Sequence, residues 1–369
     1  MRDDKNNEAT AAASRLQAVA ALGQQIWLDN LSRGLLQSGE LARWIGADGI
    51  TGVTSNPAIF YNAIRNDPAY RAELPGLQAA YPDLETRFEH LVLPDIQGAC
   101  GLLSAVYQES QGKAGFVSFE VSPRLAHDAA GTVAAARRLW RQIARPNAMI
   151  KIPATDAGIQ ALEEVIADGI NVNVTLIFSA GQLAKVQAAY QRGLQRRVDA
   201  GLPVAHLASV ASVFISRIDV VVDQQLAKMA GELQALSGKA AISAAKLAYR
   251  NWQQDLAGGF ASLAQAGARP QWLLWASTGT KNPALRDVLY VEQLIGKDTV
   301  NTVPDATLAA FRDHGEASET LAAGVDAAQQ VLNQLSDNGI LLEQIGSDLL
   351  QAGLKQFEDA YTNLLALLE

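Results

Sequence analysis

Short runs in which hydrophobic and polar residues alternate recur along the chain. In residues 171–176, Asn173 and Thr175 alternate with valines and a leucine. In residues 116–122, Glu120 and two serines alternate with valines and a phenylalanine. Because successive side chains of a β-strand point to opposite faces, each run predicts a strand with one polar and one apolar face.

The segments between these runs are long enough for helices, as in residues 126–143, 156–166 and 179–198. Strand–helix–strand order is typical of a parallel sheet covered by helices. If the apolar faces meet the helices, the polar faces point into the lumen of a closed barrel. The expected strands lie near residues 25–30, 50–54, 116–121, 148–153, 170–177, 207–214, 271–277 and 298–302. Eight such units predict a (β/α)8, or TIM, barrel, whose chemistry lies at the C-terminal ends of the strands.

A doubly wound open sheet is the alternative architecture, but the chain lacks its Gly-x-Gly-x-x-Gly nucleotide fingerprint. Residues 278–281 also lack the upstream glycine of a phosphate-binding Walker loop. We therefore expect one barrel domain over residues 1–369. Extra helices are expected within residues 61–112 and in a C-terminal tail beyond residue 316, where residues 341–368 show helical apolar spacing.

Composition narrows the function classes. The 49% of hydrophobic residues provide a large core, and a net charge of −8 argues against a general nucleic-acid binder. The single cysteine, Cys100, cannot form an internal disulfide, which fits a reducing cytoplasm. Residues 1–10 are polar without a secretion signal, and no apolar run is long enough to span a membrane. The four histidines show no metal-binding spacing, so we expect neither a metal site nor a cofactor.

Residues 148–154 form an apolar run with Lys151 in its middle. Lysine is rarely buried without a partner or function, because burial disfavours the charged ammonium and lowers its pKa. A neutral amine attacks carbonyl carbons, and lysines form Schiff bases in this way. The other interpretation is a lysine at a strand end that reaches solvent or pairs with a carboxylate.

Further polar residues fall at the expected C-terminal ends of the strands. Asp29 and Glu120 can exchange protons with a substrate, directly or through water. The alternative for these carboxylates is an ion pair that only neutralises a buried Lys151. Side chains that can hold substrate hydroxyls are those of Asn56, Asn173, Thr175 and Ser212.

Two cations follow later strands, where this fold often binds phosphate. Arg217 follows the sixth expected strand and Lys281 follows the seventh. The alternative for Arg217 is a surface salt bridge with Asp219 or Asp223 on one helix face.

Taken together, these segments resemble the transaldolase family. They occur in the order typical of that family and cover nearly the whole chain. The segments that carry the resemblance are residues 27–33, 52–57, 118–122, 149–155 and 171–179. A long loop after Asn56 and residues 276–282 resemble the longer bacterial form, which is sometimes fused to glucose-6-phosphate isomerase.

The resemblance implies a class I Schiff-base transferase of the pentose phosphate pathway, in carbohydrate metabolism. It would move a dihydroxyacetone unit from sedoheptulose 7-phosphate to glyceraldehyde 3-phosphate, giving erythrose 4-phosphate and fructose 6-phosphate. By the same resemblance, Lys151 forms the Schiff base, Glu120 and Thr175 position the catalytic water, and Asp29 is the acid/base at the cleaved bond.

The resemblance also implies a set of residues that bind the phosphorylated sugar. They are Thr54, Asn56, Asn173, Ser212, Phe214, Arg217, Ser277 and Lys281. Shorter transaldolases carry an arginine in the motif around Ser277, whereas this chain has Lys281 nearby, so the second phosphate ligand stays open.

Three other functions are alternatives for this chain. A fructose-6-phosphate aldolase belongs to the same superfamily, but Glu120 and the chain length argue against it. A catalytically silent barrel acting as a binding module is disfavoured because the lysine and both carboxylates are intact. A metal-dependent aldolase would need ligands that the motifs do not offer. We expect a cytoplasmic monomer or homodimer.

Overall fold

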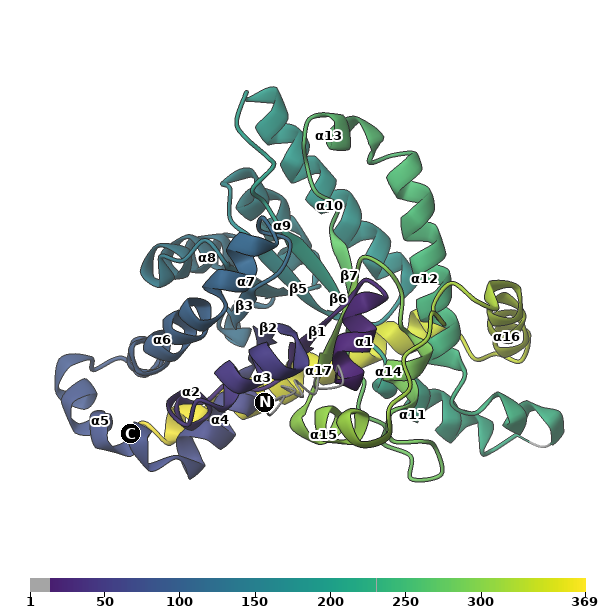
Figure 1. The fold of residues 1–369 in the computed structure, drawn as a ribbon, viewed down its shortest axis with the longest axis horizontal. Helices are drawn as coiled ribbons and strands as arrows, with labels where there is room; N and C mark the ends of the chain where they lie inside the picture. The colour runs from purple at the N-terminus through teal and green to yellow at the C-terminus, as the bar shows by residue number, and fades with distance from the viewer. Residues whose placement is uncertain (1–13, 230) are drawn as a thin grey trace, which may run out of the picture.

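Eight parallel strands close into a barrel in sequence order, which confirms the predicted (β/α)8 fold (Figure 1). The computed structural model describes residues 14–229 and 231–369, so the polar start at residues 1–10 lies outside the described residues. The strands are β1 Gln24–Leu28, β2 Ile50–Thr54, β3 Phe116–Glu120, β4 Ala148–Pro153, β5 Val172–Ile177, β6 Ser209–Phe214, β7 Trp272–Ala276 and β8 Thr299–Val303.

Helices surround the barrel between successive strands (Figure 1). They are α1 Arg15–Ala21, α2 Arg33–Gln37, α3 Glu40–Asp48, α4 Pro57–Asn66, α8 Ala129–Ile143, α9 Asp156–Ala167, α10 Ala180–Asp199, α11 Ser216–Leu226, α12 Ala240–Ala257, α13 Ala261–Gln265, α14 Leu289–Gln293 and α15 Asp305–His314. Two 3₁₀ turns precede α8 and α12, and they are η1 Pro123–Leu125 and η2 Gly231–Leu236. The helix expected over 126–143 begins only at Ala129, because the Asp128 side chain caps it.

The extra helices lie in the two predicted segments. They are α5 Pro68–Ala80, α6 Leu84–Leu102 and α7 Ser104–Glu109 in the first, and α16 Val325–Asp337 and α17 Leu342–Ala366 in the second. The expectation of a long loop after Asn56 is wrong. The Asn56 side chain accepts a hydrogen bond from the backbone N–H of Ile59, and Pro57 occupies the first helical position, so α4 starts at once.

The C-terminal helix α17 packs against the barrel and does not extend into solvent. It contacts α4, α6, α11, η1 and β5, and it runs across the molecule from α11 toward α4 (Figure 1). Arg87 and Gln78 hold its end by donating hydrogen bonds to the backbone carbonyls of Leu368 and Glu369. The helix therefore lies over strand ends on the side of the barrel where the polar residues gather.

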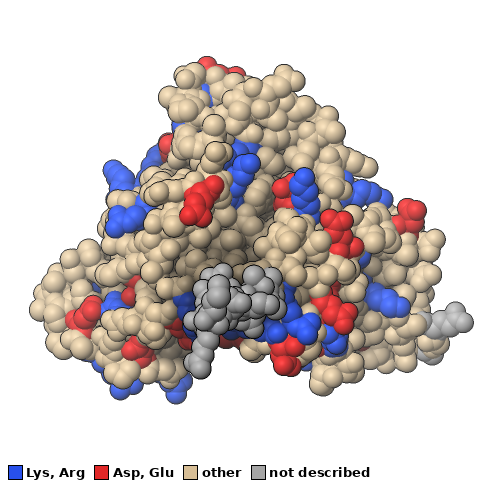
Figure 2. Space-filling view, viewed as in Figure 1, with Lys and Arg blue, Asp and Glu red and all other residues tan. Residues whose placement is uncertain are grey.

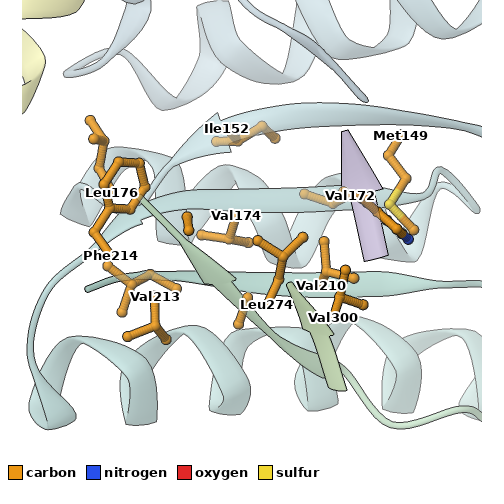
Figure 3. Packing of buried hydrophobic residues seen from close by; sticks show 14 of the residues in the cluster. Met149, Ile152, Val172, Val174, Leu176, Val210, Val213, Phe214, Leu274 and Val300 are labelled. Atoms are coloured by element: carbon orange, nitrogen blue, oxygen red, sulfur yellow. The ribbon is translucent and has the colours of Figure 1, made fainter. Parts of the chain in front are cut away.

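The lower lumen of the barrel is apolar. Strand alternation places Trp27, Val210, Leu274 and Val300 there, and Figure 3 shows the last three close together. A Cβ at Gly52 would lie 2.5 Å from the Trp27 ring, so the closeness of that ring requires a glycine. This apolar layer leaves the polar chemistry to the C-terminal half of the lumen.

The surface carries mixed charge. On the face shown in Figure 2, acidic and basic side chains are interspersed, and neither kind gathers into one large patch. None of the helices that the structure describes is both long and apolar enough to cross a membrane.

Candidate active site

A cavity of about 220 Å³ opens at the C-terminal ends of the strands. The sequence-predicted residues that line it are Asp29, Thr54, Asn56, Lys151, Asn173, Thr175, Ser212, Phe214, Arg217, Ser277 and Lys281. Glu120 lines a smaller adjoining cavity on the other side of Asn56. Larger cavities of about 300 and 550 Å³ lie at the barrel floor and beside the starts of α9 and α10. Lys151 lines neither of these larger cavities, so the 220 Å³ cavity is the candidate active site.

Lys151 lies inside the barrel on β4 and is only 5% exposed. Its Nζ donates a hydrogen bond to the Ser55 carbonyl (3.1 Å) and lies 3.2 Å from Oε2 of Glu120. The ring of Phe357, from α17, has its centroid 5.6 Å from Nζ. The lysine does not reach solvent, and its closest charged neighbour is the carboxylate expected from the sequence.

Glu120 is the last residue of β3 and pairs in register with Lys151. Burial raises its pKa to about 7, although the nearby Lys151 lowers it, and the charge of Asp29 raises it further. The contact with Lys151 lacks hydrogen-bond geometry, so within the described chain the buried Oε2 has no hydrogen-bond partner. The buried Oγ1 of Thr175, on β5, is also without one among the described residues. Glu120 and Thr175 thus offer polar atoms on the two strands that flank Lys151.

Asp29 has a different environment from that of Glu120. It follows β1 directly and lies just past the strand end, where its backbone N–H donates to the Val303 carbonyl (2.8 Å). The Thr54 hydroxyl donates to Oδ1 of Asp29 (2.8 Å) and lies 2.9 Å from the Thr302 hydroxyl. Asp29 is half-buried, and the two carboxylates are therefore suited to different proton-transfer roles.

A chain of hydrogen bonds fixes the amide and hydroxyl groups of the lumen. Ser212 Oγ donates to Asn173 Oδ1 (2.7 Å), and Asn173 Nδ2 donates to Ser118 Oγ (3.0 Å). These buried residues come from β6, β5 and β3, so the network fixes the orientation of the Asn173 amide across three strands. A substrate would meet polar groups that are already oriented.

Arg217 lies at the rim of the cavity, at the start of α11. Nη1 donates to Oε1 of Gln356 (2.9 Å), and Cζ lies 5.3 Å from the centroid of the Phe214 ring. Burial lowers its pKa, and the charge of Asp29 opposes that shift. A guanidinium stays charged at neutral pH in spite of such a shift, so Arg217 presents a positive charge at the cavity.

The alternative salt bridge of Arg217 with Asp219 or Asp223 is wrong. Asp219 instead accepts hydrogen bonds from the backbone N–H of Ala241 and the hydroxyl of Tyr290, each 2.8 Å long. Asp223 accepts from the backbone N–H of Gly238 (2.9 Å). Both carboxylates tie α11 to neighbouring segments, while Arg217 is turned toward the cavity.

The loop after β7 supplies the other cation. Ser277 has a φ of 56°, and its hydroxyl lies 2.9 Å from that of Ser216, which ties this loop to the start of α11. Lys281 is exposed yet lines the same cavity as Arg217. No three histidine, cysteine, aspartate or glutamate side chains cluster as metal ligands within residues 14–229 and 231–369.

Comparison with known proteins identifies the family of the chain. A family model described as "Transaldolase/Fructose-6-phosphate aldolase" matches residues 26–368. The chain belongs to this family. It is 50% identical over 350 residues to a protein of Thiobacillus denitrificans named "Transaldolase", covering 94% of this chain and 98% of that one. It is 52% identical over 352 residues to "Transaldolase" of Neisseria meningitidis serogroup A, with 95% and 98% covered.

A more distant relative, "Transaldolase 2" of Nostoc sp., is 43% identical over 372 residues, and the alignment covers 97% of each chain. The resemblance to transaldolase that the sequence motifs indicated is thereby confirmed. The matches extend through the C-terminal tail, so α17 belongs to the matched part of the chain.

Sequence reasoning missed several residues at the site of this transaldolase/fructose-6-phosphate aldolase family member. Thr302 lines the cavity from β8. It shares the lumen face of the strand with Val300, while the intervening Asn301 points the other way, and this period of two is the signal that could have revealed it. Phe357 lines the cavity from α17, and the adjacent Gln356 contacts Arg217. Apolar spacing in the tail indicates a helix, but it gives no sign of where that helix packs.

Proposed function

We propose that this protein is a transaldolase, which transfers a dihydroxyacetone unit from sedoheptulose 7-phosphate to glyceraldehyde 3-phosphate. The observation that carries the proposal is a buried Lys151 paired with Glu120 beside a cavity that also contains Asp29 and Arg217. A nucleophilic amine, a proton-transfer group and a charged anchor are what Schiff-base chemistry on a sugar phosphate needs.

In the first half-reaction, Nζ of Lys151 forms a bond to the carbonyl carbon of the ketose, giving a carbinolamine. Loss of water, assisted by Glu120, converts it to an iminium. Asp29 then accepts the proton of the adjacent substrate hydroxyl as the neighbouring carbon–carbon bond breaks. The bonding electrons move into the iminium, erythrose 4-phosphate leaves, and an enamine remains on Lys151.

In the second half-reaction, the enamine carbon attacks the aldehyde carbon of glyceraldehyde 3-phosphate. The π pair of the enamine forms the new carbon–carbon bond, and the nitrogen lone pair restores the iminium. Asp29 donates its proton to the former aldehyde oxygen as that oxygen becomes an alkoxide. Water then adds to the iminium carbon, with Glu120 and Thr175 holding it. Release of the amine yields fructose 6-phosphate and restores Lys151. Every proton taken up by a carboxylate is thus given back within one cycle.

The remaining groups would bind the substrate. Asn173 and Ser212, fixed by their hydrogen bonds, would hold hydroxyls of the dihydroxyacetone part, together with Asn56, Thr54 and Ser277. Phe214 would form an apolar wall. Arg217 would bind the phosphate, and Lys281 is the proposed second phosphate ligand because it lines the same cavity.

The proposal covers residues 1–369 as one catalytic barrel domain. It would act in the cytoplasm, as a monomer or homodimer, on phosphorylated sugars, with no metal or cofactor and no nucleic-acid or membrane partner. Fructose-6-phosphate aldolase activity is the second candidate, since the family's description includes it.

Trapping of the covalent intermediate tests the proposal. Borohydride reduction in the presence of fructose 6-phosphate should add the mass of a reduced dihydroxyacetone adduct to the peptide that contains Lys151. Lys151→Arg should abolish the adduct, while Lys185→Arg, an exposed lysine on α10, should leave it unchanged. An adduct on Lys281 or Lys185 would contradict the assignment.

A further inference from the structure

The C-terminal helix α17 brings consecutive residues to two different functional groups of the barrel. Phe357 is buried, and its ring faces Nζ of Lys151. Gln356 is exposed at the rim, and its Oε1 accepts a hydrogen bond of 2.9 Å from Nη1 of Arg217. A helix from the far end of the chain therefore contacts both the amine and the cation of the candidate site.

The approach of α17 to the barrel at this point is close. A Cβ on Gly353 would lie 3.0 Å from Cδ2 of Leu176 and 3.7 Å from Nη1 of Arg217. Leu176 itself has a φ of 60°, at a register shift in the pairing of β5 with β6. A left-handed conformation in a leucine is costly, so the surrounding packing must hold it. Gln356 is thus presented from a well-packed part of α17.

The chemistry of this contact is specific. Within the described chain, no carboxylate oxygen lies within the 4.0 Å salt-bridge distance of the Arg217 nitrogens, and its side-chain hydrogen-bond partner is a neutral amide. A carboxylate at position 356 would hold the guanidinium equally well, but it would neutralise the charge and repel an anion. An amide fixes the guanidinium while leaving its charge unneutralised and its other N–H groups free for a phosphate.

We propose that Gln356 is a positioning residue, which orients Arg217 for the substrate phosphate and must be uncharged to do so. The inference rests on the proposed function, because it assumes that the ligand of Arg217 is a sugar phosphate. It assigns to the C-terminal helix a part in substrate specificity, in addition to its packing against the barrel.

Two substitutions separate orientation from charge. Gln356→Ala removes the acceptor and should raise KM for fructose 6-phosphate about three- to tenfold, as expected for a hydrogen bond to a charged group at a partly exposed rim. Gln356→Glu keeps the acceptor but adds a negative charge, and it should raise KM further. With unphosphorylated fructose as donor, KM should be unchanged for both variants, and kcat with either donor should stay near the parent value.

Competitive inhibition by inorganic phosphate gives a readout that does not depend on the chemical step. Its inhibition constant should rise in the same order, with Gln356→Glu above Gln356→Ala. The matched control is Gln344→Glu, which adds the same charge to the same helix about 18 Å further along the axis, at 1.5 Å per residue. In an Arg217→Ala background, Gln356→Ala should have no further effect on phosphate, because the guanidinium that Gln356 orients is absent.

The failure of this inference differs from that of the proposed function. If the parent enzyme forms no Lys151 adduct, the proposed function fails. Another outcome is that the parent transfers normally while the Gln356 variants raise KM equally for both donors, or for neither. In that case Gln356 does not position Arg217 and the inference is overturned. A lower KM for Gln356→Ala would overturn it as well, because Gln356 would then compete with the phosphate.

Discussion

Glu120 and Lys151 occupy paired positions on neighbouring parallel strands, with Oε2 of the carboxylate 3.2 Å from Nζ of the amine. A buried ion pair contributes little to stability, because the cost of desolvating two charges offsets their attraction. Oε2 also lacks a hydrogen-bond partner among the described residues, which adds to that cost. An arrangement that stabilises the fold so poorly is better explained by chemistry at the amine.

The first prediction concerns pH and Glu120, whose pKa is raised to about 7 by burial. Transfer activity should fall as the pH drops below about 7, because a protonated Glu120 can no longer accept the proton of the catalytic water. Glu120→Gln should lower kcat and remove this acidic limb. The measurement is kcat against pH for both proteins, and an unchanged limb in the variant would assign it to another group.

The same shift sets the sign of a stability effect. Because the pKa of Glu120 in the folded protein lies above its ordinary value, the folded state binds the extra proton more readily than the unfolded chain. The stabilisation that comes from this proton is complete at a pH below the pKa of Glu120 in the unfolded chain, and it is lost as the pH rises through about 7. The ionised form of Glu120, which the proposed mechanism requires, is therefore the form that destabilises the fold.

The second prediction concerns the charge of Arg217. Arg217→Ala should raise KM for phosphorylated sugars about ten- to hundred-fold, the value of a charge-assisted hydrogen bond, and change KM for unphosphorylated sugars far less. No salt-bridge partner within the described chain would be left unpaired, so the fold should keep its stability. Arg192→Ala, on the outer surface of α10, is the control. An equal loss on both substrate types would mean that Arg217 supports the fold and does not bind phosphate.

The alternating pattern of the strands is why much of the site could be predicted from the sequence. Lys151, Glu120 and Asn173 share the lumen because a period of two is a local property of a strand, independent of distant packing. The hydroxyl of Thr54 and the carboxylate of Asp29 meet because parallel strands end at one edge.

Contacts made by α17 could not be predicted in this way. Its apolar residues indicate an amphipathic helix, but the groove that receives it is formed by α4, α11 and β5, which lie far away in the sequence. The orientation of Arg217 could not be predicted either, because two acidic residues, Asp219 and Asp223, follow it in the same segment. In the structure, Asp219 is buried and accepts hydrogen bonds from Ala241 and Tyr290, so it does not pair with Arg217.

The third prediction concerns stability and Asp219, which is 1% exposed. Burial raises its pKa to about 6, although hydrogen bonds from Ala241 and Tyr290 lower it. As the pH rises from about 4 to 7, through the folded pKa of about 6, ionisation of this carboxyl should lower the free energy of unfolding by up to about 3 kcal/mol. Asp219→Asn should remove that part of the pH dependence.

Urea unfolding of the parent and the variant at both ends of this pH range measures the effect as a difference between two proteins. Asp337→Asn, at an exposed position on α16, is the control and should leave the slope unchanged. If Asp219→Asn has the same slope as the parent, another carboxyl is responsible for it.

The last prediction separates group transfer from simple aldol cleavage. In the proposed mechanism the enzyme holds an enamine on Lys151 after the first aldehyde leaves, and a transferase must protect this enamine until the acceptor arrives. Lys151 is 5% exposed and is covered by Phe357, so bulk water reaches the enamine slowly. Fructose 6-phosphate alone should therefore give little free dihydroxyacetone. Added erythrose 4-phosphate should give rapid release of glyceraldehyde 3-phosphate.

The measurement for this prediction is the ratio of free dihydroxyacetone formed without acceptor to transfer product formed with it. Phe357→Ala should raise that ratio, because removal of the ring opens the site beside Lys151 to water. Leu350→Ala, on a part of α17 away from Lys151, is the matched control and should leave the ratio unchanged. If the parent enzyme releases dihydroxyacetone as fast as it transfers it, the aldolase reaction is the correct assignment. If Phe357→Ala leaves a low ratio unchanged, the protection of the enamine comes from other groups, with Glu120 and Thr175 as the next residues to test.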